Sequence, residues 1–271
     1  MKADLHVHTN ISDSNLSLED TIRISKKKGV RFLAITNHDT VEGLEEAIAV
    51  GLEHNIQVVP GVEISAFDYK RGRKVHILGY NFNLKAKHIK ELCQPLLKRR
   101  KENSLWQIKT LKDHGFDITL QEVLEKAQNS TSIYKQHIMA VLMDKGYTDG
   151  IYSALYYDLF RRNGICARDI EYVDVFAAAS AVKNDGGQAV LAHPGQLDSY
   201  EIMEELWEAG LLDGVELYHE DHRPEDCQII YDYARKRSLF LTGGSDYHGS
   251  YGGKTPLGGM PLTLEWIKPL L

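Results

Sequence analysis

The chain has 271 residues, 43% of them hydrophobic, which is enough for one large α/β domain or for a barrel that carries an insertion. Its formal net charge of −6 argues against tight binding to duplex nucleic acid, because phosphate contacts dominate that affinity, but it leaves room for a small or single-stranded phosphorylated ligand. No apolar run has the length of a transmembrane helix, and three scattered cysteines form no disulfide or metal pattern. We therefore expect a cytoplasmic protein with no membrane partner.

The first predicted strand carries the segment DLHVHT, in which Leu5 and Val7 alternate with His6 and His8. Such alternation predicts one buried face and one face directed at something polar. Both imidazoles then point the same way, and two converging neutral imidazoles are suited to binding a metal ion. The alternative is a pair of surface histidines on an edge strand, which this motif alone does not rule out.

Helices and strands alternate over the following residues. A helix is predicted from about residue 18, with a stop at Lys26–Gly29, and then strand 31–36, helix 41–53, strand 56–65 and strand 75–80. This alternation predicts a parallel sheet with functional side chains along one rim.

Residues 86–172 are mostly polar and helical in pattern. Apolar residues recur at helical spacing from Leu92 to Leu111, and Gly115 ends that run. Further helices are predicted over 119–128, 134–145 and 149–161. We expect this block to be an inserted helical cap, with residues 1–85 and 173–271 forming the domain around it.

Alternation resumes after the predicted cap. Helices are expected over 174–185, 199–209 and 224–237, and strands over 188–193, 213–218 and 239–244. Candidate functional side chains collect at the ends of the predicted strands, where the catalytic groups of barrels and open α/β folds lie. They are His6, His8, His38, Asp39, Glu63, His76, His193, His219, Asp246 and His248, with Asp13 just past the first strand.

Several of these motifs together resemble a known family. DLHVHT, Asp13, TNHDT, GVEIS, the strand histidine His76, AHPG and GGSDYHG are similar, in the same order, to the motifs of the polymerase-and-histidinol-phosphatase (PHP) superfamily. The resemblance covers residues 1–80 and roughly 186–259. The helical block resembles the insertion of a subgroup whose members remove phosphate from nucleoside 5′-monophosphates, 3′,5′-bisphosphonucleosides or short RNA 5′ ends.

The resemblance implies an α/β fold, a distorted (β/α)7 barrel with an inserted helical cap, and two or three divalent metal ions. Carried over by position, the first ion has the ligands His6, His8, Glu63 and Asp246. Glu63 bridges to a second ion bound by His76 and His193, and a third ion is bound by Asp13, His38 and His248. Glu63, His193 and Asp246 are also the residues expected to take part in the chemical step.

Ligand chemistry agrees with this expectation. Neutral imidazoles with a few carboxylates suit Mn²⁺, Fe²⁺ or Zn²⁺ better than Ca²⁺ or Mg²⁺, which prefer oxygen. A bridging carboxylate sets two ions about 3.5–4 Å apart, the separation used for phosphoryl hydrolysis, and a water bound there loses a proton near neutral pH. Asp4 and Asp39 lie beside ligands and are predicted to orient imidazoles by hydrogen bonds, or else to be structural partners in turns.

The cap supplies the expected substrate contacts. The subgroup usually carries Arg-Pro-His, and this chain has Lys135, Gln136 and His137 there, so a point charge replaces the fork of an arginine. We expect Lys135 and His137 to face the metal ions, unless they are ordinary surface residues. His219 and His222 lie where substrate or leaving group could be reached.

Three functions remain open at this stage. The favoured one is a metal-dependent phosphatase acting on a small phosphomonoester such as a nucleotide, with a short-RNA 5′–3′ exonuclease as a variant. The second is a metallohydrolase of C–N or ester bonds, because barrel hydrolases share histidine clusters. The third is a noncatalytic metal-binding PHP domain, against which the complete ligand set argues.

Overall fold

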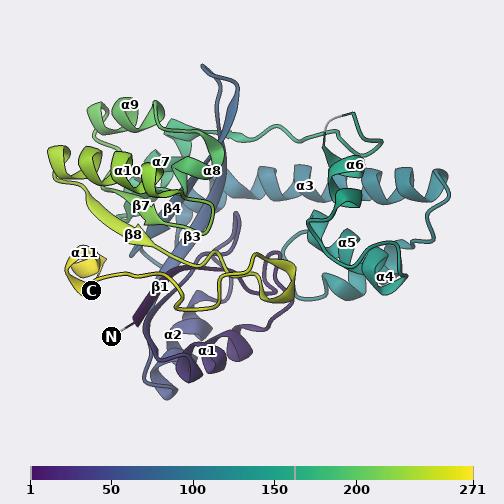
Figure 1. Cartoon of the computed structure of the whole chain (residues 1–271), viewed down its shortest axis with the longest axis horizontal. Helices are drawn as coiled ribbons and strands as arrows, with labels where there is room; N and C mark the ends of the chain where they lie inside the picture. The colour runs from purple at the N-terminus through teal and green to yellow at the C-terminus, as the bar shows by residue number, and fades with distance from the viewer. Residues whose placement is uncertain (1, 162, 271) are drawn as a thin grey trace.

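The computed structural model describes residues 2–161 and 163–270, and its centre is a mixed sheet (Figure 1). The strands follow the order β1-β2-β3-β4-β6-β7-β8, and β5 pairs with β3 outside this path. Their bounds are β1 Lys2–Val7, β2 Val30–Ile35, β3 Gln57–Asp68, β4 Arg73–Tyr80, β5 Val173–Asp174, β6 Gln188–Leu191, β7 Gly214–Tyr218 and β8 Phe240–Gly243.

The helices fall into two groups. Those that accompany the sheet are α1 Leu18–Lys27, α2 Leu44–Glu53, α7 Val175–Asn184, α8 Pro194–Leu197, α9 Ile202–Glu208, α10 Pro224–Arg237 and α11 Leu264–Ile267, with 3₁₀ turns η1 Gly249–Tyr251 and η2 Lys268–Leu270. Between β4 and β5 lie α3 Lys87–Asp113, α4 Leu120–Lys126, α5 Lys135–Asp144 and α6 Ala154–Phe160. Among the described residues, no helix is both long and apolar enough to cross a membrane.

The sheet is mostly parallel, as predicted, but β4 departs from this arrangement. This strand runs antiparallel to both of its neighbours, β3 and β6. The reason is the short turn between Asp68 and Arg73, since a connection of this length joins only antiparallel strands. The reversal matters for the site because the start of β4, with His76 paired to Ser65, lies at the rim where the parallel strands end.

The two edges of the sheet approach each other at this rim. Val7 at the end of β1 forms a parallel bridge with Tyr247, which follows β8, and the His8 N–H donates to the Tyr247 carbonyl at 3.0 Å. This bridge brings the segment after β8 beside the residues that follow β1. Closure of the sheet into a seven-stranded barrel stays a prediction.

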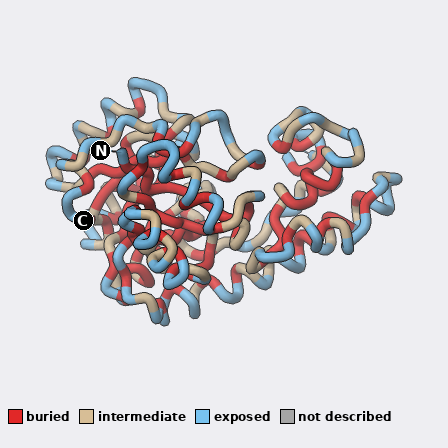
Figure 2. Tube along the Cα trace, turned by 90° about the horizontal axis from the view of Figure 1, so that it is seen from below, coloured by how far each residue is buried: buried red, intermediate tan, exposed pale blue. Residues whose placement is uncertain are grey.

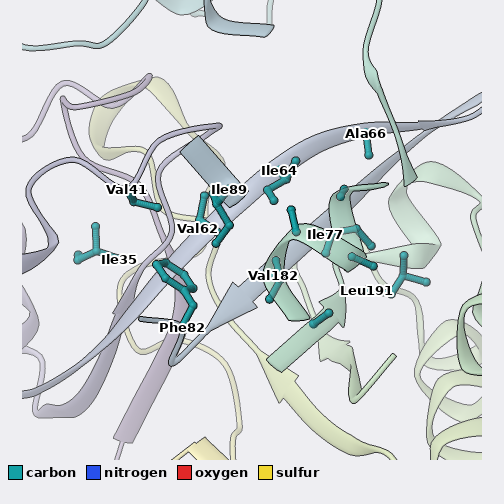
Figure 3. Close-up of a cluster of buried hydrophobic side chains, with 14 of the residues drawn as sticks. Ile35, Val41, Val62, Ile64, Ala66, Ile77, Phe82, Ile89, Val182 and Leu191 are labelled. Carbon is teal, nitrogen blue, oxygen red and sulfur yellow. The ribbon is translucent and has the colours of Figure 1, made fainter. Parts of the chain in front are cut away.

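Of the three hydrophobic clusters among the described residues, one lies between strands of the sheet and includes Leu5, Leu78 and Val190, and the other two occupy different parts of the chain. The larger one packs the sheet against its helices, and Figure 3 shows Ile64, Ile77, Val182 and Leu191 meeting there from β3, β4, α7 and β6. The smaller cluster takes its residues from 108–166 and adds Tyr251. Figure 2 shows the second buried group in the smaller lobe, apart from the main body.

Helix α3 connects the two clusters. Ile89, Cys93 and Leu96 in its first half belong to the large cluster, whereas Ile108 and Leu111 in its second half belong to the small one. In Figure 1 this helix extends from the sheet to α4, α5 and α6. We propose from this arrangement that residues 86–172 form a cap that α3 carries and anchors to the body.

Candidate metal centre and its cavity

Four buried ligand atoms converge at the ends of β1, β3 and β8. Glu63 Oε2 lies 3.2 Å from both His6 Nε2 and His8 Nε2. Asp246 Oδ1 lies 3.3 Å from His6 Nε2 and 3.1 Å from His8 Nε2. None of these four atoms has a hydrogen-bond partner in the described part of the chain. Ligand atoms held about 2.0 Å from one ion in a tetrahedron are about 3.3 Å apart, so this group fits a metal ion.

The second oxygen of Glu63 faces a different pair of imidazoles. Glu63 Oε1 lies 2.7 Å from His76 Nδ1 and 2.9 Å from His193 Nε2. On the Oε2 side, a further imidazole nitrogen, His38 Nδ1, lies 3.2 Å away and also lacks a hydrogen-bond partner among the described residues. A single carboxylate thus stands between two sets of candidate ligands, as a bridging ligand would.

A third group gathers around Asp13. Its Oδ2 lies 3.3 Å from His248 Nε2 and 3.8 Å from His38 Nε2, and its Oδ1 lies 3.6 Å from His8 Nδ1. The ligand atoms of these four residues come close enough to one another to surround one ion. His8 and His38 therefore each present their two ring nitrogens to two different groups.

Burial sets the protonation of several imidazoles. Burial lowers the pKa of both His38 and His193 to about 4, which outweighs the opposing effect of nearby carboxylates. Burial also raises the pKa of the Glu63 carboxyl, but electrostatic attraction to the surrounding imidazoles and the hydrogen bond with His193 outweigh it and hold that pKa well below its usual range. At neutral pH the cluster therefore presents neutral His38 and His193 and an ionised Glu63, which are the forms that bind metals.

Glu216 on β7 is a functional residue that the sequence analysis missed. Its Oε1 accepts a hydrogen bond from His6 Nδ1 at 3.0 Å, and its Oε2 accepts from the His193 N–H at 2.8 Å. The carboxylate is fully buried, and His193 has a backbone φ of 25°, a strained value for a residue other than glycine. Glu216 thus orients His6 and stabilises the backbone of His193.

We expect Glu216→Gln to weaken metal binding by about 10–100-fold, the usual effect of removing the hydrogen-bond partner of a ligating histidine. Competition with a chromophoric chelator would measure the affinity. Glu208→Gln, an exposed substitution on α9, is the matched control. Unchanged metal affinity in Glu216→Gln would show that Glu216 does not orient a ligand.

Of the two roles predicted for Asp4 and Asp39, their contacts fit that of a structural hydrogen-bond partner and not that of a partner to an imidazole. Asp4 accepts hydrogen bonds from the N–H groups of Ser245 at 2.9 Å and Gly258 at 2.8 Å. Asp39 Oδ1 accepts from the Ser65 N–H at 2.7 Å. Each carboxylate is turned toward a neighbouring backbone segment, so both hold the loops that carry the ligands rather than the ligand rings.

Three cap residues reach the rim directly, and the sequence analysis assigned them no role. Gln136 Nε2 donates to Asp13 Oδ2 at 2.9 Å, and the Tyr134 hydroxyl donates to the His38 carbonyl at 3.0 Å. The Arg100 guanidinium donates to Asp39 Oδ2 at 2.6 Å. The cap is therefore hydrogen-bonded to one candidate ligand side chain and to the backbone of another.

The two cap residues predicted to contact substrate, Lys135 and His137, lie in different surroundings. Lys135 lines the cavity above the metal cluster. His137 is fully buried, accepts a hydrogen bond from the Tyr134 N–H at 3.1 Å and is not part of the cavity wall. The expectation that His137 faces the metal ions is wrong, because its ring instead caps the first turn of α5.

His219 and His222 also lie outside the cavity wall. His219 Nδ1 accepts from the Asp221 N–H, so its Nε2 donates to Asp246 Oδ2 at 3.3 Å and leaves Oδ1 directed at the metal cluster. His222 accepts from the Gly195 N–H at 3.1 Å and donates to the Leu217 carbonyl at 2.8 Å. These two rings are therefore not placed to contact the substrate. Instead, His219 orients the candidate ligand Asp246, and His222 holds a loop in place.

The metal cluster opens into a cavity of about 930 Å³ between the sheet rim and the cap. Seven of the predicted ligands line it together with basic and tyrosine side chains of the cap. The seven are Asp13, His38, Glu63, His76, His193, Asp246 and His248. This volume is typical of a site for a small ligand.

Comparison with known proteins finds a family model, characterised relatives and a solved structure that are similar to this chain. The family model for the PHP domain matches residues 4–206. The chain is 46% identical to the phosphoribosyl 1,2-cyclic phosphate 1,2-diphosphodiesterase of Eggerthella lenta, over 93% of this chain and 96% of that one. It is 25% identical to the 3′,5′-nucleoside bisphosphate phosphatase of Chromobacterium violaceum, over 94% and 90% of the two chains. A solved structure from Bifidobacterium adolescentis, described as a metal-dependent phosphoesterase, superposes with a TM-score of 0.91 at 26% identity, covering 99% and 94%.

Proposed function

The chain belongs to the PHP domain family and is a metal-dependent phosphoesterase, and we propose that it hydrolyses the cyclic phosphodiester of a phosphoribosyl 1,2-cyclic phosphate. The relative with this activity in its name is 46% identical and matches over nearly the full length of both chains. The structural observation that supports the proposal is the Glu63-centred cluster on the wall of a cavity of about 930 Å³. That cavity suits a phosphorylated sugar better than a polymer.

We infer that the cluster holds two or three divalent ions of Mn, Fe or Zn. The first would bind to His6, His8, Glu63 and Asp246, the second to Glu63, His76 and His193, and the third to Asp13, His38 and His248. When bound, such ions polarise phosphoryl oxygens and lower the pKa of a coordinated water. Hydrolysis then adds one water across one P–O ester bond, so that the ring opens, the leaving oxygen takes the proton and a phosphomonoester remains.

A nucleotide, as expected from the sequence, is the second candidate substrate. The relative named for 3′,5′-nucleoside bisphosphates supports it, but at 25% identity. Both candidate substrates are small and carry phosphate on ribose. Short single-stranded RNA is a third substrate to test, because its 5′-phosphorylated end also presents a phosphate group on a ribose.

A substrate screen with Mn²⁺-loaded protein tests the proposal. We expect the highest kcat/KM for phosphoribosyl 1,2-cyclic phosphate, lower values for 3′,5′-bisphosphonucleosides and 5′-phosphorylated oligoribonucleotides, and none for amides and lactones. Release of phosphate and of the ring-opened product can be followed by ³¹P NMR. Preference for a nucleotide or RNA would overturn the cyclic substrate, and turnover of amides or lactones alone would overturn phosphoester hydrolysis.

A further inference from the structure

A group of basic side chains lines the same cavity apart from the metal cluster. Lys74 comes from β4, Lys135 from the first turn of α5, and Arg161 follows α6. Two of the three are parts of the cap and one is part of the sheet, so the group spans the opening between them. The three residues are about 25 positions or more apart in the sequence, so no local pattern indicates that they line the same cavity.

One carboxylate, that of Asp169, lies within this group. Lys74 Nζ lies 2.5 Å from Asp169 Oδ2 and donates to the Tyr172 hydroxyl at 3.0 Å. Lys135 is half-buried, and its ammonium group lies 5.9 Å from the centroid of the Phe160 ring, without a hydrogen bond or ion pair to the described residues. Burial lowers the pKa of Lys135 to about 8, the nearby Lys74, Arg161 and Arg100 act in the same direction, and Asp169 opposes them. Arg100 is already paired with Asp39.

The spacing along β4 relates this group to the metal cluster. Lys74 and His76 are two residues apart on one strand, and both line the cavity. Side chains at i and i+2 of a strand share a face and lie about 7 Å apart. The Lys74 side chain therefore starts roughly one sugar ring away from that of a predicted metal ligand and faces the same cavity.

We propose that Lys74, Lys135 and Arg161 bind a second phosphoryl group of the substrate while the first lies at the metal cluster. This inference rests on the proposed function and deepens it, since it makes two phosphoryl groups on opposite sides of a ribose the feature that the enzyme selects. Three cations against one carboxylate leave a surplus positive charge that a phosphoryl dianion neutralises. Lys74 keeps its place through Tyr172 when the anion competes with Asp169.

Paired substrates separate this subsite from the metal site. We expect Lys74→Ala and Lys135→Ala each to lower kcat/KM for phosphoribosyl 1,2-cyclic phosphate by about 10–100-fold, the loss expected for a hydrogen bond to a charged group. Ribose 1,2-cyclic phosphate, which lacks the 5-phosphate, should change by less than about threefold. Lys74→Arg should retain most of the preference for the doubly phosphorylated substrate. Lys70→Ala, on the exposed β3–β4 turn, is the control.

Binding of ribose 5-phosphate, measured by calorimetry on metal-loaded protein, gives a readout that does not need turnover. We expect each alanine variant to bind it at least tenfold more weakly while keeping the wild-type metal content. Equal losses on both cyclic substrates, or unchanged binding of ribose 5-phosphate, would overturn the subsite. If the wild-type protein hydrolyses no phosphoester but still binds ribose 5-phosphate through these residues, the proposed function fails and the subsite stands.

Discussion

Glu63→Gln is expected to lower kcat/KM by at least about 10³-fold, a barrier increase of about 4 kcal/mol, and to release most of the bound metal. In the structure one oxygen of Glu63 faces His6 and His8, and the other faces His76 and His193. An amide offers only one ligating oxygen and no negative charge. The amide therefore cannot bridge between the two sets of imidazoles, and at least one metal ion loses the negatively charged ligand that Glu63 provides.

Metal content by elemental analysis and steady-state kinetics on the preferred phosphoester measure this effect. Glu53→Gln, exposed at the end of α2, is the matched control for removal of one carboxylate. Circular dichroism should show an intact fold, since Glu63 lies on a strand that keeps its pairing with β2 and β4. Activity retained within about tenfold, only about 1.4 kcal/mol, would contradict a bridging role.

Much of the metal site is predictable because its residues follow strands. His6 and His8 share a face by the alternation of strand side chains, and His38, His193 and Asp246 follow buried apolar runs. The carboxyl ends of parallel strands meet at one rim, so the sequence pattern alone brings these residues together. His76 reaches the same rim for another reason, the reversal of β4, which the alternation of elements did not reveal.

The residues that orient the ligands are not predictable in this way. Glu216 is a single carboxylate in a buried strand, and its partner His6 is 210 positions away. No local pattern distinguishes it from an exposed residue on an edge strand. The contacts of the cap are equally hard to predict from the sequence. Gln136 lies beside Asp13 because of the way α3 positions the cap against the sheet. The prediction for His137 is wrong because the sequence around a buried histidine that caps a helix does not differ from that around a histidine facing a ligand.

Elemental analysis of protein prepared without chelators is expected to find at least two transition-metal ions per chain. The four ligand atoms of the first group have no hydrogen-bond partner among the described residues, which points to tight binding, and the other oxygen of Glu63 faces a second pair of imidazoles. Removal of these ions by a chelator should abolish turnover, and Mn²⁺ should restore it. A content at or below one ion per chain, even after reconstitution with Mn²⁺, would contradict a multinuclear site.

The group around Asp13 should release its ion first. Both carboxylate oxygens of Asp13 already accept hydrogen bonds, Oδ1 from the Ser12 hydroxyl at 2.9 Å and Oδ2 from Gln136 at 2.9 Å. These donors compete with a metal ion for the same lone pairs, whereas the four ligand atoms of the first group, which includes Glu63 Oε2, have no hydrogen-bond partner in the described structure. In a stepwise chelator titration, one equivalent should therefore leave at lower chelator concentration than the rest. Gln136→Ala should raise the chelator concentration needed for that equivalent, and an unchanged titration would show that the cap does not control the third ion.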